Sequence, residues 1–527
     1  MSARLHEFLR VTAAGTPAAT AVVDRSSAVS YGELDAQVDA AAAGLAALGI
    51  ERGDRVAVLM PKRVEKVVAL FAVLRAGAVA VPVNPLLKGP QVGHILRDSG
   101  AAALVTTGQR LPDLFGELGT LAGLRAIIVS GEGGQQSSAG LSVVPWSRLL
   151  EGGPTPPAAE GDEHELAVIF YTSGSTGKPK GVMVSQRNLT VGARSVAEYL
   201  GCCREDRVLA ALSFSFDYGF NQLATSFLVG ATIVLLDYLL PQEVLRTIER
   251  ERITALAGVP PMWIQLAALD WPPGARRLRY LTNSGGAMPR ATLARLRAIL
   301  PEAKIYLMYG LTEAFRSTYL APAEVDRRPD SIGRAIPNVE VLVLRPDGTP
   351  CAAGEPGELV HRGPLVALGY WNDAERTAQR FRIVPGQRIT DAPPELEVWS
   401  GDTVRRDEEG YLYFIGRRDE MIKTSGYRVS PTEVEEEAYA TGLVADAVAL
   451  GVPHERLGQG IVLVTSAAAG QSADSERLLD ALRRRLPRFM LPLWIEWRQE
   501  LPRSANGKYD RARLRDELGR RFLDGPA

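Results

Sequence analysis

The chain has few of the features that mark proteins outside the cytoplasm. Only three cysteines occur among its 527 residues, and two of them, Cys202 and Cys203, are adjacent, which argues against a disulfide framework. No stretch approaches the roughly 20 consecutive apolar residues that a membrane span needs. Charged residues interrupt the first 15 residues, where a signal peptide would have an unbroken apolar core. We therefore expect a cytoplasmic protein with no membrane partner.

The chain also has few histidines and a formal net charge close to zero. The five histidines are dispersed and lack the spacing of a zinc site: His6, His94, His164, His361 and His454. The formal net charge is -1, so the chain lacks the basic excess of a general polyanion binder. We therefore expect no structural zinc site and no nucleic-acid partner.

The pattern of apolar residues predicts the fold class. Helical patterns alternate with short apolar segments, at 31–50, 55–60, 64–77, 78–83, 101–107 and 124–130. This rhythm predicts an α/β fold in which crossover helices join parallel strands. Because 527 residues exceed what one hydrophobic core usually serves, we expect at least two domains.

Three further regions differ in texture from this alternation. Residues 131–163 are rich in Gly, Ser and Pro, and we expect a loop or linker there. From about residue 335, strand-like segments are separated by turn signals. From about residue 420, helix and strand patterns mix in a compact region. We therefore expect the β-rich and compact regions to follow the α/β part.

A glycine-rich stretch, YTSGSTGKPKG at 171–181, follows an apolar strand and has the composition of a phosphate loop. It does not have Walker spacing, because only Ser175 and Thr176 separate Gly174 from Gly177. Pro179 also lacks the N–H that a phosphate-cradling turn would supply. Its hydroxyls, glycines and lysines suit the β- and γ-phosphates of a nucleotide, whereas the loop taken alone is more typical of a mobile surface turn.

Four more segments follow this loop in a fixed order. They are YGLTEA at 309–314, GYWNDAERTAQRF from 369, WSGDTVRRDEEGYLYFIGRRDEMIKTSGYRVSPTEVE from 399 and LPRSANGKYDR from 501. Together with the loop, they resemble the signature of the adenylate-forming superfamily, which includes acyl-CoA synthetases, free-standing adenylation domains and firefly luciferase. The resemblance covers nearly the whole chain.

The resemblance implies a fold and a domain boundary. It implies an α/β N-terminal domain, residues 1–418, with stacked αβαβα layers and a β-barrel-like subdomain. A small mobile α+β C-terminal domain, residues 419–527, would carry a catalytic lysine. In the family this domain rotates about a hinge, matched here by Asp419, while Gly426 matches the close-approach glycine beside the thiol. Such closure gates chemistry in many enzymes.

The resemblance also implies a reaction with two steps. A carboxylate attacks the α-phosphate of ATP and expels pyrophosphate, and a thiol then opens the mixed anhydride. ATP and Mg²⁺ are the implied cofactors. Lys508, Thr312 and Glu313 are the implied catalytic residues, with Glu313 also suited to Mg²⁺. Lys508 would bridge the substrate carboxylate and the oxygens of the nucleotide, where charge develops.

The nucleotide would be held by residues from several of the matched segments. Tyr309 offers a flat face to adenine, and Asp402 and Arg417 would bind the ribose hydroxyls. The implied nucleotide-binding residues are Thr172, Ser173, Gly174, Ser175, Thr176, Gly177, Lys180, Gly285, Gly286, Ala287, Met308, Tyr309, Gly310, Asp402 and Arg417.

The segment LSFSFDYGFNQL bears on which acid is activated. Asp217 falls where amino-acid-activating enzymes of the family place the aspartate that holds the α-amino group. A buried carboxylate needs a charged partner, and an ammonium group would provide one. Arg316 is the rival partner, because it could neutralise Asp217 internally. The implied substrate-binding residues are Asp217, Tyr218, Asn221, Thr282, Ser284 and Arg316, with Met308 as a further wall of the pocket.

Two kinds of relative resemble FSFDYGFNQ combined with YGLTEAFRSTYL. One kind activates L-proline and loads it onto the phosphopantetheine arm of a carrier protein for pyrrole formation. The other is the AMP-forming ligases associated with the exosortase system, whose acid would not be an amino acid. We expect the first, with a carrier protein or coenzyme A as an acceptor supplied in trans. Gln186 departs from the family, since many relatives have histidine there.

Two other functions fit the residues less well. A non-catalytic ATP-binding relative is disfavoured because Glu313, Asp402 and Lys508 are all present. A phosphotransferase is disfavoured because the Walker spacing is missing. An adenylate-forming ligase is therefore the function that we predict.

Overall fold

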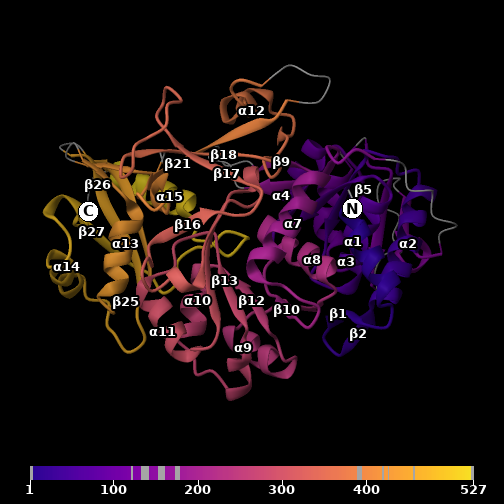
Figure 1. Ribbon diagram of the computed structural model, residues 1–527, viewed down its shortest axis with the longest axis horizontal. Helices are drawn as coiled ribbons and strands as arrows, with labels where there is room; N and C mark the ends of the chain where they lie inside the picture. The colour runs from indigo at the N-terminus through magenta and orange to yellow at the C-terminus, as the bar shows by residue number, and fades with distance from the viewer. Residues whose placement is uncertain are drawn as a thin grey trace.

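The computed structural model describes the chain except residues 1–3, 120, 122, 132–141, 152–160, 173–178, 388–393, 418–419, 425–426, 455–456 and 524–527. Two large sheets and three layers of helices form its N-terminal part (Figure 1), and a smaller sheet with its own helices forms the C-terminal part. The predicted α/β fold, with a large N-terminal and a small C-terminal domain, is confirmed. No helix of the described residues is both long and apolar enough to cross a membrane.

The first sheet has eight strands in the order β19-β9-β8-β4-β3-β5-β6-β7. Its strands are β3 (Arg55–Leu59), β4 (Val79–Val83), β5 (Ala101–Thr107), β6 (Ala126–Ser130), β7 (Ser142–Pro145), β8 (Leu166–Thr172), β9 (Lys180–Ser185) and β19 (Gly369–Tyr370). Strands β3 to β8 pair in parallel, and β9 pairs antiparallel with β8 and β19. Both faces of the sheet are covered, which explains the continuous apolar runs in β3, β4 and β6.

The region predicted as a loop or linker at 131–163 contains two elements, so that prediction was wrong in part. Strand β7 extends the first sheet by pairing in parallel with β6. A short helix, α6 (Trp146–Leu149), follows it and buries Leu149. The surrounding glycine, serine and proline residues dominated the composition, and a four-residue strand at a sheet edge leaves too short a pattern to detect.

The second sheet begins with parallel strands and continues as an antiparallel arm. Its parallel strands are β1 (Thr20–Asp24), β10 (Arg207–Ala210), β11 (Thr232–Leu235), β12 (Ala255–Gly258), β13 (Tyr280–Asn283) and β14 (Lys304–Tyr309), with β2 (Ser27–Ser30) antiparallel at the edge. The arm contains β15 (Thr318–Leu320), β16 (Ser331–Ala335), β17 (Glu340–Leu344), β18 (Pro356–Arg362), β20 (Phe381–Ile383), β21 (Leu396–Arg406) and β22 (Leu412–Arg417). The arm is the β-rich region predicted from residue 335.

The helices form three layers around these two sheets. The middle layer, between the sheets, has α1 (His6–Gly15), α2 (Tyr31–Ala47), α3 (Val64–Arg75), α7 (Gln186–Leu200) and α8 (Asp217–Val229). One outer layer has α4 (Gly89–Ser99) and α5 (Phe115–Leu118), and the other has α9 (Pro241–Arg250), α10 (Pro260–Ala267) and α11 (Arg290–Ile299). Helix α12 (Ala374–Arg380) lies on the arm. This is the predicted αβαβα arrangement.

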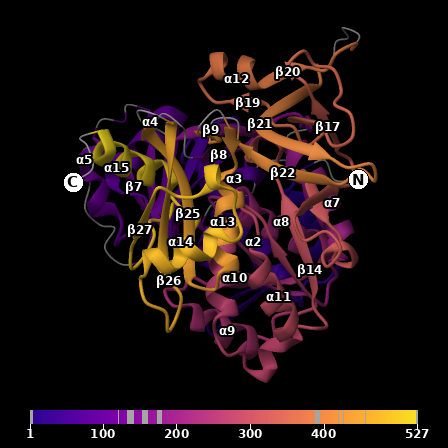
Figure 2. The ribbon, with the colours of Figure 1, turned by 90° about the vertical axis from the view of Figure 1, so that its left-hand side faces the viewer.

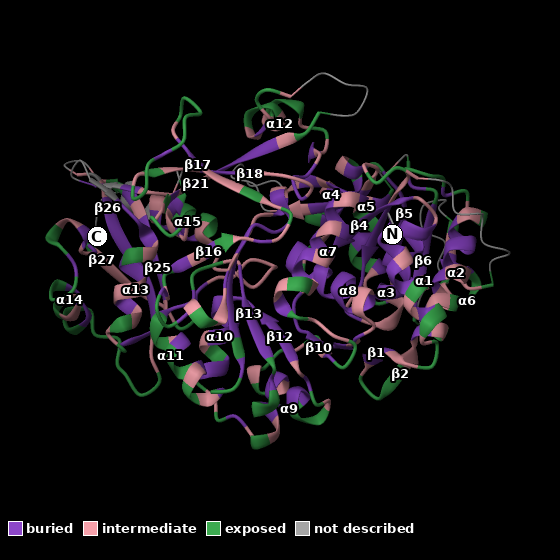
Figure 3. Cartoon of the chain, viewed as in Figure 1, coloured by how far each residue is buried: buried purple, intermediate pink, exposed green. Residues whose placement is uncertain are grey.

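Burial follows from these layers (Figure 3). Helix α3 is buried around its circumference because a sheet covers it on each side, and the middle of its sequence, VVALFAVL at 67–74, is entirely apolar. Helix α9 lies in an outer layer and buries only one face, with Val244, Leu245 and Ile248 inward. The sequence of each helix therefore matches its layer.

The C-terminal part has one sheet with helices on both faces (Figure 2). Its elements are β23 (Ile422–Thr424), β24 (Tyr427–Val429), α13 (Pro431–Ala440), β25 (Val444–His454), β26 (Gly458–Ala467), α14 (Ser475–Arg483), β27 (Trp494–Trp497) and α15 (Arg511–Leu523). Helices α13 and α14 pack on one face of the sheet, and α15 packs on the other. Short 3₁₀ helices lie at Leu111–Leu114, Pro273–Arg277, Thr312–Ala314, Pro322–Glu324 and Arg488–Met490.

Candidate active site

The glycine-rich loop connects the ends of two paired strands. Thr172 ends β8 and Lys180 begins β9, and the two residues face each other in the antiparallel ladder. The hydroxyl oxygen of Thr172 is buried and has no hydrogen-bond partner among the described residues. The predicted residues Ser173, Gly174, Ser175, Thr176 and Gly177 lie outside the described residues.

Glu313 is held in a compact group of polar side chains. Lys180 Nζ lies 2.9 Å from Glu313 Oε1, and the Tyr370 hydroxyl donates to the same oxygen at 2.7 Å. Lys180 Nζ also lies 4.2 Å from the centre of the Tyr370 ring. Burial alone would raise the pKa of Glu313, but the Lys180 charge and these hydrogen bonds outweigh it and lower that pKa below its usual value. Glu313 is therefore an ionised carboxylate at neutral pH.

Tyr309, Asp402 and Arg417 meet at the junction of the parallel sheet and the antiparallel arm. Asp402 in β21 faces Arg417 in β22, and Arg417 Nε donates to Asp402 Oδ1 at 3.0 Å. The hydroxyl of Tyr309, at the end of β14, donates to Asp402 Oδ2. The structure thus brings together three residues that the sequence separates by up to 108 positions, counted from Tyr309 to Arg417.

Lys508 reaches this region from the C-terminal part of the chain. Its Nζ lies 5.0 Å from the centre of the Phe216 ring. A Cβ atom added at Gly285 would lie 2.6 Å from Lys508 Cε, and Gly285 also has a left-handed backbone with φ of +81°. A Cβ atom at position 285 would therefore force the end of the Lys508 side chain to shift, and the positive φ favours glycine there. Burial lowers the pKa of the Lys508 ammonium group, and Asp217 opposes that change.

Asp217 lies at the first turn of α8 and is almost fully buried, with 4% of its surface exposed. Thr312 Oγ1 donates to its Oδ1 at 3.2 Å, and Arg316 Nη1 lies 3.4 Å from its Oδ2. Burial raises the pKa of Asp217, and the charges of Arg316 and Lys508 and the Thr312 hydrogen bond only partly oppose this. Asp217 is therefore less fully compensated than Glu313.

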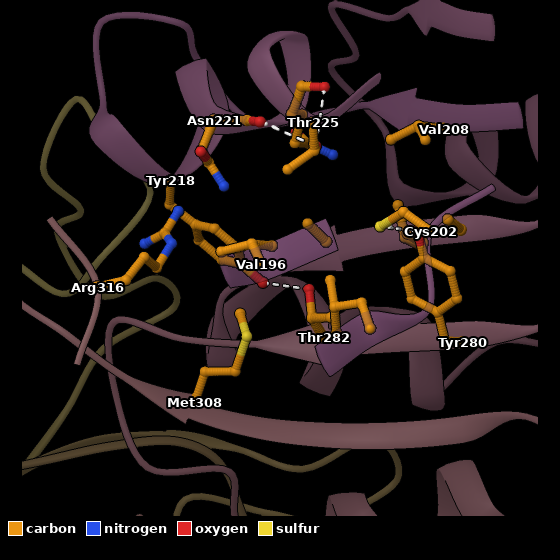
Figure 4. Close-up of a pocket in the computed structure, with 15 residues that line it drawn as sticks. Val196, Cys202, Val208, Tyr218, Asn221, Thr225, Tyr280, Thr282, Met308 and Arg316 are labelled. Carbon is orange, nitrogen blue, oxygen red and sulfur yellow. Dashed lines mark hydrogen bonds between the residues drawn. The ribbon is translucent and has the colours of Figure 1, made fainter. Parts of the chain in front are cut away.

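A cavity of about 40 Å³ lies next to Arg316, between helices α7 and α8 and the strands β10, β12, β13 and β14 (Figure 4). Tyr218, Thr282, Asn221, Arg316 and Met308 contribute to its lining, together with mainly aliphatic side chains. The Tyr218 and Thr282 hydroxyls are hydrogen-bonded to each other at 2.5 Å. The volume holds roughly three water molecules.

Several polar atoms in this lining are unpaired. Asn221 Oδ1, Gln222 Oε1, and Nε and Nη2 of Arg316 are buried and have no hydrogen-bond partner among the described residues. Figure 4 shows the Asn221 amide and the Arg316 guanidinium directed toward the same space beside Tyr218. Because burying an unpaired polar atom costs free energy, these groups mark the cavity as a place where a ligand can complete hydrogen bonds.

The remaining predicted residues lie close to this core or outside the described chain. Ser284, Gly286 and Ala287 follow β13, and Gly310 follows β14. Asp419 and Gly426, predicted at the hinge and beside the thiol, lie outside the described residues. Gln186, predicted as a departure from many relatives, accepts a hydrogen bond from the Leu5 amide at 3.0 Å and so has a structural contact.

Sequence reasoning did not single out two residues in contact with the site. Tyr370 was part of the quoted segment GYWNDAERTAQRF, and only the structure shows that its hydroxyl binds Glu313. Asn84 carried no motif at all, and its amide donates to the Ala505 carbonyl, three residues before Lys508. The only sequence feature that could have indicated a role for Tyr370 was its position, as an aromatic residue with a hydroxyl group, in a polar segment.

Two family models match the chain. The AMP-binding enzyme model covers residues 9–371, and the AMP-binding enzyme C-terminal domain model covers residues 433–508. The chain belongs to the AMP-binding enzyme family. It is thus an AMP-forming ligase of the adenylate-forming superfamily, as the sequence motifs predicted.

Curated relatives of this AMP-binding enzyme differ in what they act on. A feruloyl-CoA synthase of an Amycolatopsis species is 33% identical over 96% of each chain. An L-proline–[L-prolyl-carrier protein] ligase of Pseudomonas fluorescens is 31% identical over 97% of this chain and 98% of that protein. A linear gramicidin synthase of Brevibacillus parabrevis is 32% identical over 97% of this chain, which spans only 6% of that protein.

Among solved structures, an o-succinylbenzoate coenzyme A synthetase of Bacillus subtilis with ATP and magnesium ion is similar, with a TM-score of 0.79. It is 26% identical, over 97% of this chain and 98% of that chain. Enzymes of this family use ATP with Mg²⁺. The residues present fit that pair, because the unpaired Thr172 hydroxyl and Lys180 are donors for phosphate, and Glu313 is a hard oxygen ligand.

Proposed function

We propose that this AMP-forming ligase activates an amino acid, with L-proline as the specific candidate. It then transfers the aminoacyl group to the phosphopantetheine thiol of a carrier protein. The observation that carries the proposal is the buried Asp217 carboxylate, which contacts Arg316 of the cavity lining and whose pKa is raised because its compensation is incomplete. The ammonium group of an amino acid would supply the missing charge. The likeness to a proline–carrier-protein ligase supports the same choice.

The proposed first step joins the acid to the nucleotide. An oxygen of the substrate carboxylate forms a bond to the α-phosphorus of ATP, and the bond from that phosphorus to the bridging oxygen breaks. Pyrophosphate leaves with the electron pair. Lys508, whose ammonium lies near Asp217, would neutralise charge on the carboxylate and α-phosphate as the bond forms. Mg²⁺, held by Glu313, would neutralise phosphate charge.

The proposed second step opens the adenylate. The thiol sulfur bonds to the acyl carbon, the acyl–oxygen bond to the phosphate breaks, AMP leaves, and the thiol proton passes to solvent. We propose that residues 419–527 rotate as a domain between the steps, so that Lys508 leaves the site. The proposed nucleotide-binding residues of the N-terminal domain would not move with it; these are Tyr309, Asp402 and Arg417.

Pyrophosphate–ATP exchange with a panel of amino acids and simple carboxylic acids tests the proposal. We expect an amino acid, L-proline first among them, to support exchange, and we expect transfer to a carrier protein to exceed transfer to coenzyme A. If no carboxylic acid supports exchange, the chain is not an active ligase. If only acids without an amino group do so, the role proposed for Asp217 is wrong.

A second candidate function is an acyl-CoA ligase for an acid without an amino group, of the kind found with the exosortase system. The Arg316–Asp217 contact at 3.4 Å favours it, because the guanidinium already offsets part of the carboxylate charge. The likeness to a feruloyl-CoA synthase also favours it. The same exchange panel separates the two candidates.

A further inference from the structure

Asn84 joins the N-terminal sheet to the segment that carries Lys508. It follows β4 directly, and 6% of its surface is exposed. The Leu86 amide donates to Asn84 Oδ1 at 2.9 Å, which orients the side chain. Asn84 Nδ2 then donates to the Ala505 carbonyl at 2.7 Å. One well-oriented amide thus connects parts of the chain that are 421 residues apart.

The segment that Asn84 holds is a closed turn. The Ser504 amide donates to the Lys508 carbonyl at 2.6 Å, and the Gly507 amide donates to the Ser504 carbonyl at 2.9 Å. Ala505 lies inside this turn, so fixing its carbonyl fixes the position of the turn as a whole. Lys508 leaves from the end of the turn toward Phe216.

The opposite side of the turn is bounded by the second sheet. Gly285 approaches the Lys508 side chain so closely that a Cβ atom would contact it. Asn84 comes from the first sheet, and Gly285 follows β13 of the second sheet. The lysine turn therefore lies between the Asn84 hydrogen-bond donor and the steric boundary at Gly285.

We propose that Asn84 is a positioning residue for adenylate formation, because its amide fastens the lysine turn in the arrangement that brings Lys508 into the site. This inference rests on the function proposed above. The contact is present in this arrangement, and a rotation that removes Lys508 must break it. A group that stabilises one of two arrangements shifts their populations by its own differential free energy. Asn84 thus favours the first step over the second.

The variant Asn84→Asp removes the donor. It keeps the size of the side chain and the oxygen that accepts from Leu86, but it has no N–H for the Ala505 carbonyl and places a carboxylate oxygen against it. We expect adenylate formation, followed by pyrophosphate–ATP exchange, to fall at least about 3- to 10-fold, because one hydrogen bond is lost and the carboxylate repels the carbonyl. Transfer to the thiol from a supplied aminoacyl-adenylate should be unchanged or faster.

The control is Leu86→Ala, which alters an exposed side chain two residues away and should leave both steps at the wild-type rate. An equal loss of both steps in Asn84→Asp, or no loss in either, would overturn the proposal. A fall in exchange alone supports it, since a general folding defect would slow both steps.

Hydrogen exchange of the free protein tests the same contact without substrate. In Asn84→Asp we expect the Ser504 and Gly507 amides to exchange about 3- to 10-fold faster than in the wild type, because the turn is released more often. Unchanged protection of these amides would overturn the proposal. If no acid supports pyrophosphate–ATP exchange in the wild type, the proposed function fails. Hydrogen exchange of these amides would still decide whether Asn84 holds the lysine turn.

Discussion

The two ends of the site treat their buried carboxylates differently. At the nucleotide end, Glu313 has contacts of 2.7 to 2.9 Å with Tyr370 and Lys180, and its pKa is lowered. At the acid end, Asp217 has contacts of 3.2 to 3.4 Å with Thr312 and Arg316, and its pKa is raised. The protein's own residues outweigh the cost of burying the Glu313 charge, whereas they offset the cost of burying the Asp217 charge only in part.

The difference separates shared chemistry from specificity. All family members use ATP, so the residues around Glu313 need not change with the acid. Lys180 and Tyr370 can therefore provide fixed polar contacts to Glu313. The acid varies between relatives, and we propose that it binds beside Asn221 and Arg316, whose side chains have unpaired atoms among the described residues. On this proposal, these incomplete polar environments indicate the specificity of the enzyme more directly than its motifs do.

Lys508→Ala should have the largest effect, because we propose that Lys508 neutralises charge on both the substrate carboxylate and the α-phosphate. We expect adenylate formation to fall about 100- to 1,000-fold, the usual cost of removing one group that stabilises developing charge. Thiol transfer from a supplied adenylate should stay near the wild-type rate. Rapid-quench measurement of each step checks this, and equal loss of both steps would count against the rotation of the C-terminal domain.

Asp217→Asn should impair use of the amino acid and leave ATP binding unchanged. We expect exchange with the preferred amino acid to fall about 100-fold, since the ammonium loses its charged partner. The KM for ATP should change little. The matched control is Arg316→Gln, which removes the rival cation and should preserve or raise amino-acid exchange. A loss of activity in Arg316→Gln that equals the loss in Asp217→Asn would show that the two residues act as an internal pair.

Lowering the pH should separate the two ends. Because the pKa of Asp217 is raised and that of Glu313 is lowered, Asp217 takes up a proton first as the pH falls from neutrality. We expect the KM for the amino acid to rise up to about tenfold per pH unit below the pKa of Asp217. The KM for Mg²⁺–ATP should rise only at lower pH. Parallel rises in both constants would contradict the comparison.

The smallest expected effect concerns two asparagines in different environments. The Asn221 amide oxygen is unpaired among the described residues, whereas Asn188 donates to the carbonyls of Pro364 and Val366 at 2.7 and 2.9 Å. Asn188→Leu should lower the free energy of unfolding by about 2 kcal/mol, and Asn221→Leu by less than about 1 kcal/mol. Urea unfolding measures both, and a larger loss for Asn221→Leu would show that its amide is structurally satisfied.

Much of the fold followed from local patterns. The alternation that predicted α2, β3, α3 and β4 is strong because each element is buried in a layer that dictates its pattern of apolar residues. Strand β7 escaped notice because four residues at a sheet edge have no period of their own. The antiparallel arm was detected from turn signals, although its continuity with the second sheet was not predictable from them.

The candidate site was predictable where its residues lie in contiguous motifs. Tyr309, Thr312 and Glu313 belong to one such motif, and their roles stay predictions. The Asp217–Arg316 contact could be anticipated only as an alternative, because spacing does not fix which partner a buried charge takes. The contact of Asn84 with Ala505 was not predictable, since it joins distant segments through a single amide.

The most direct test compares an amino acid with the same acid lacking its amino group in pyrophosphate–ATP exchange, beginning with L-proline and cyclopentanecarboxylate. The two acids differ at the one group that Asp217 is proposed to bind. We expect the preferred amino acid to support exchange at least about 30-fold faster than its analogue. Equal rates for an amino acid and its analogue, or exchange with analogues alone, would contradict the assignment of Asp217 to the substrate ammonium.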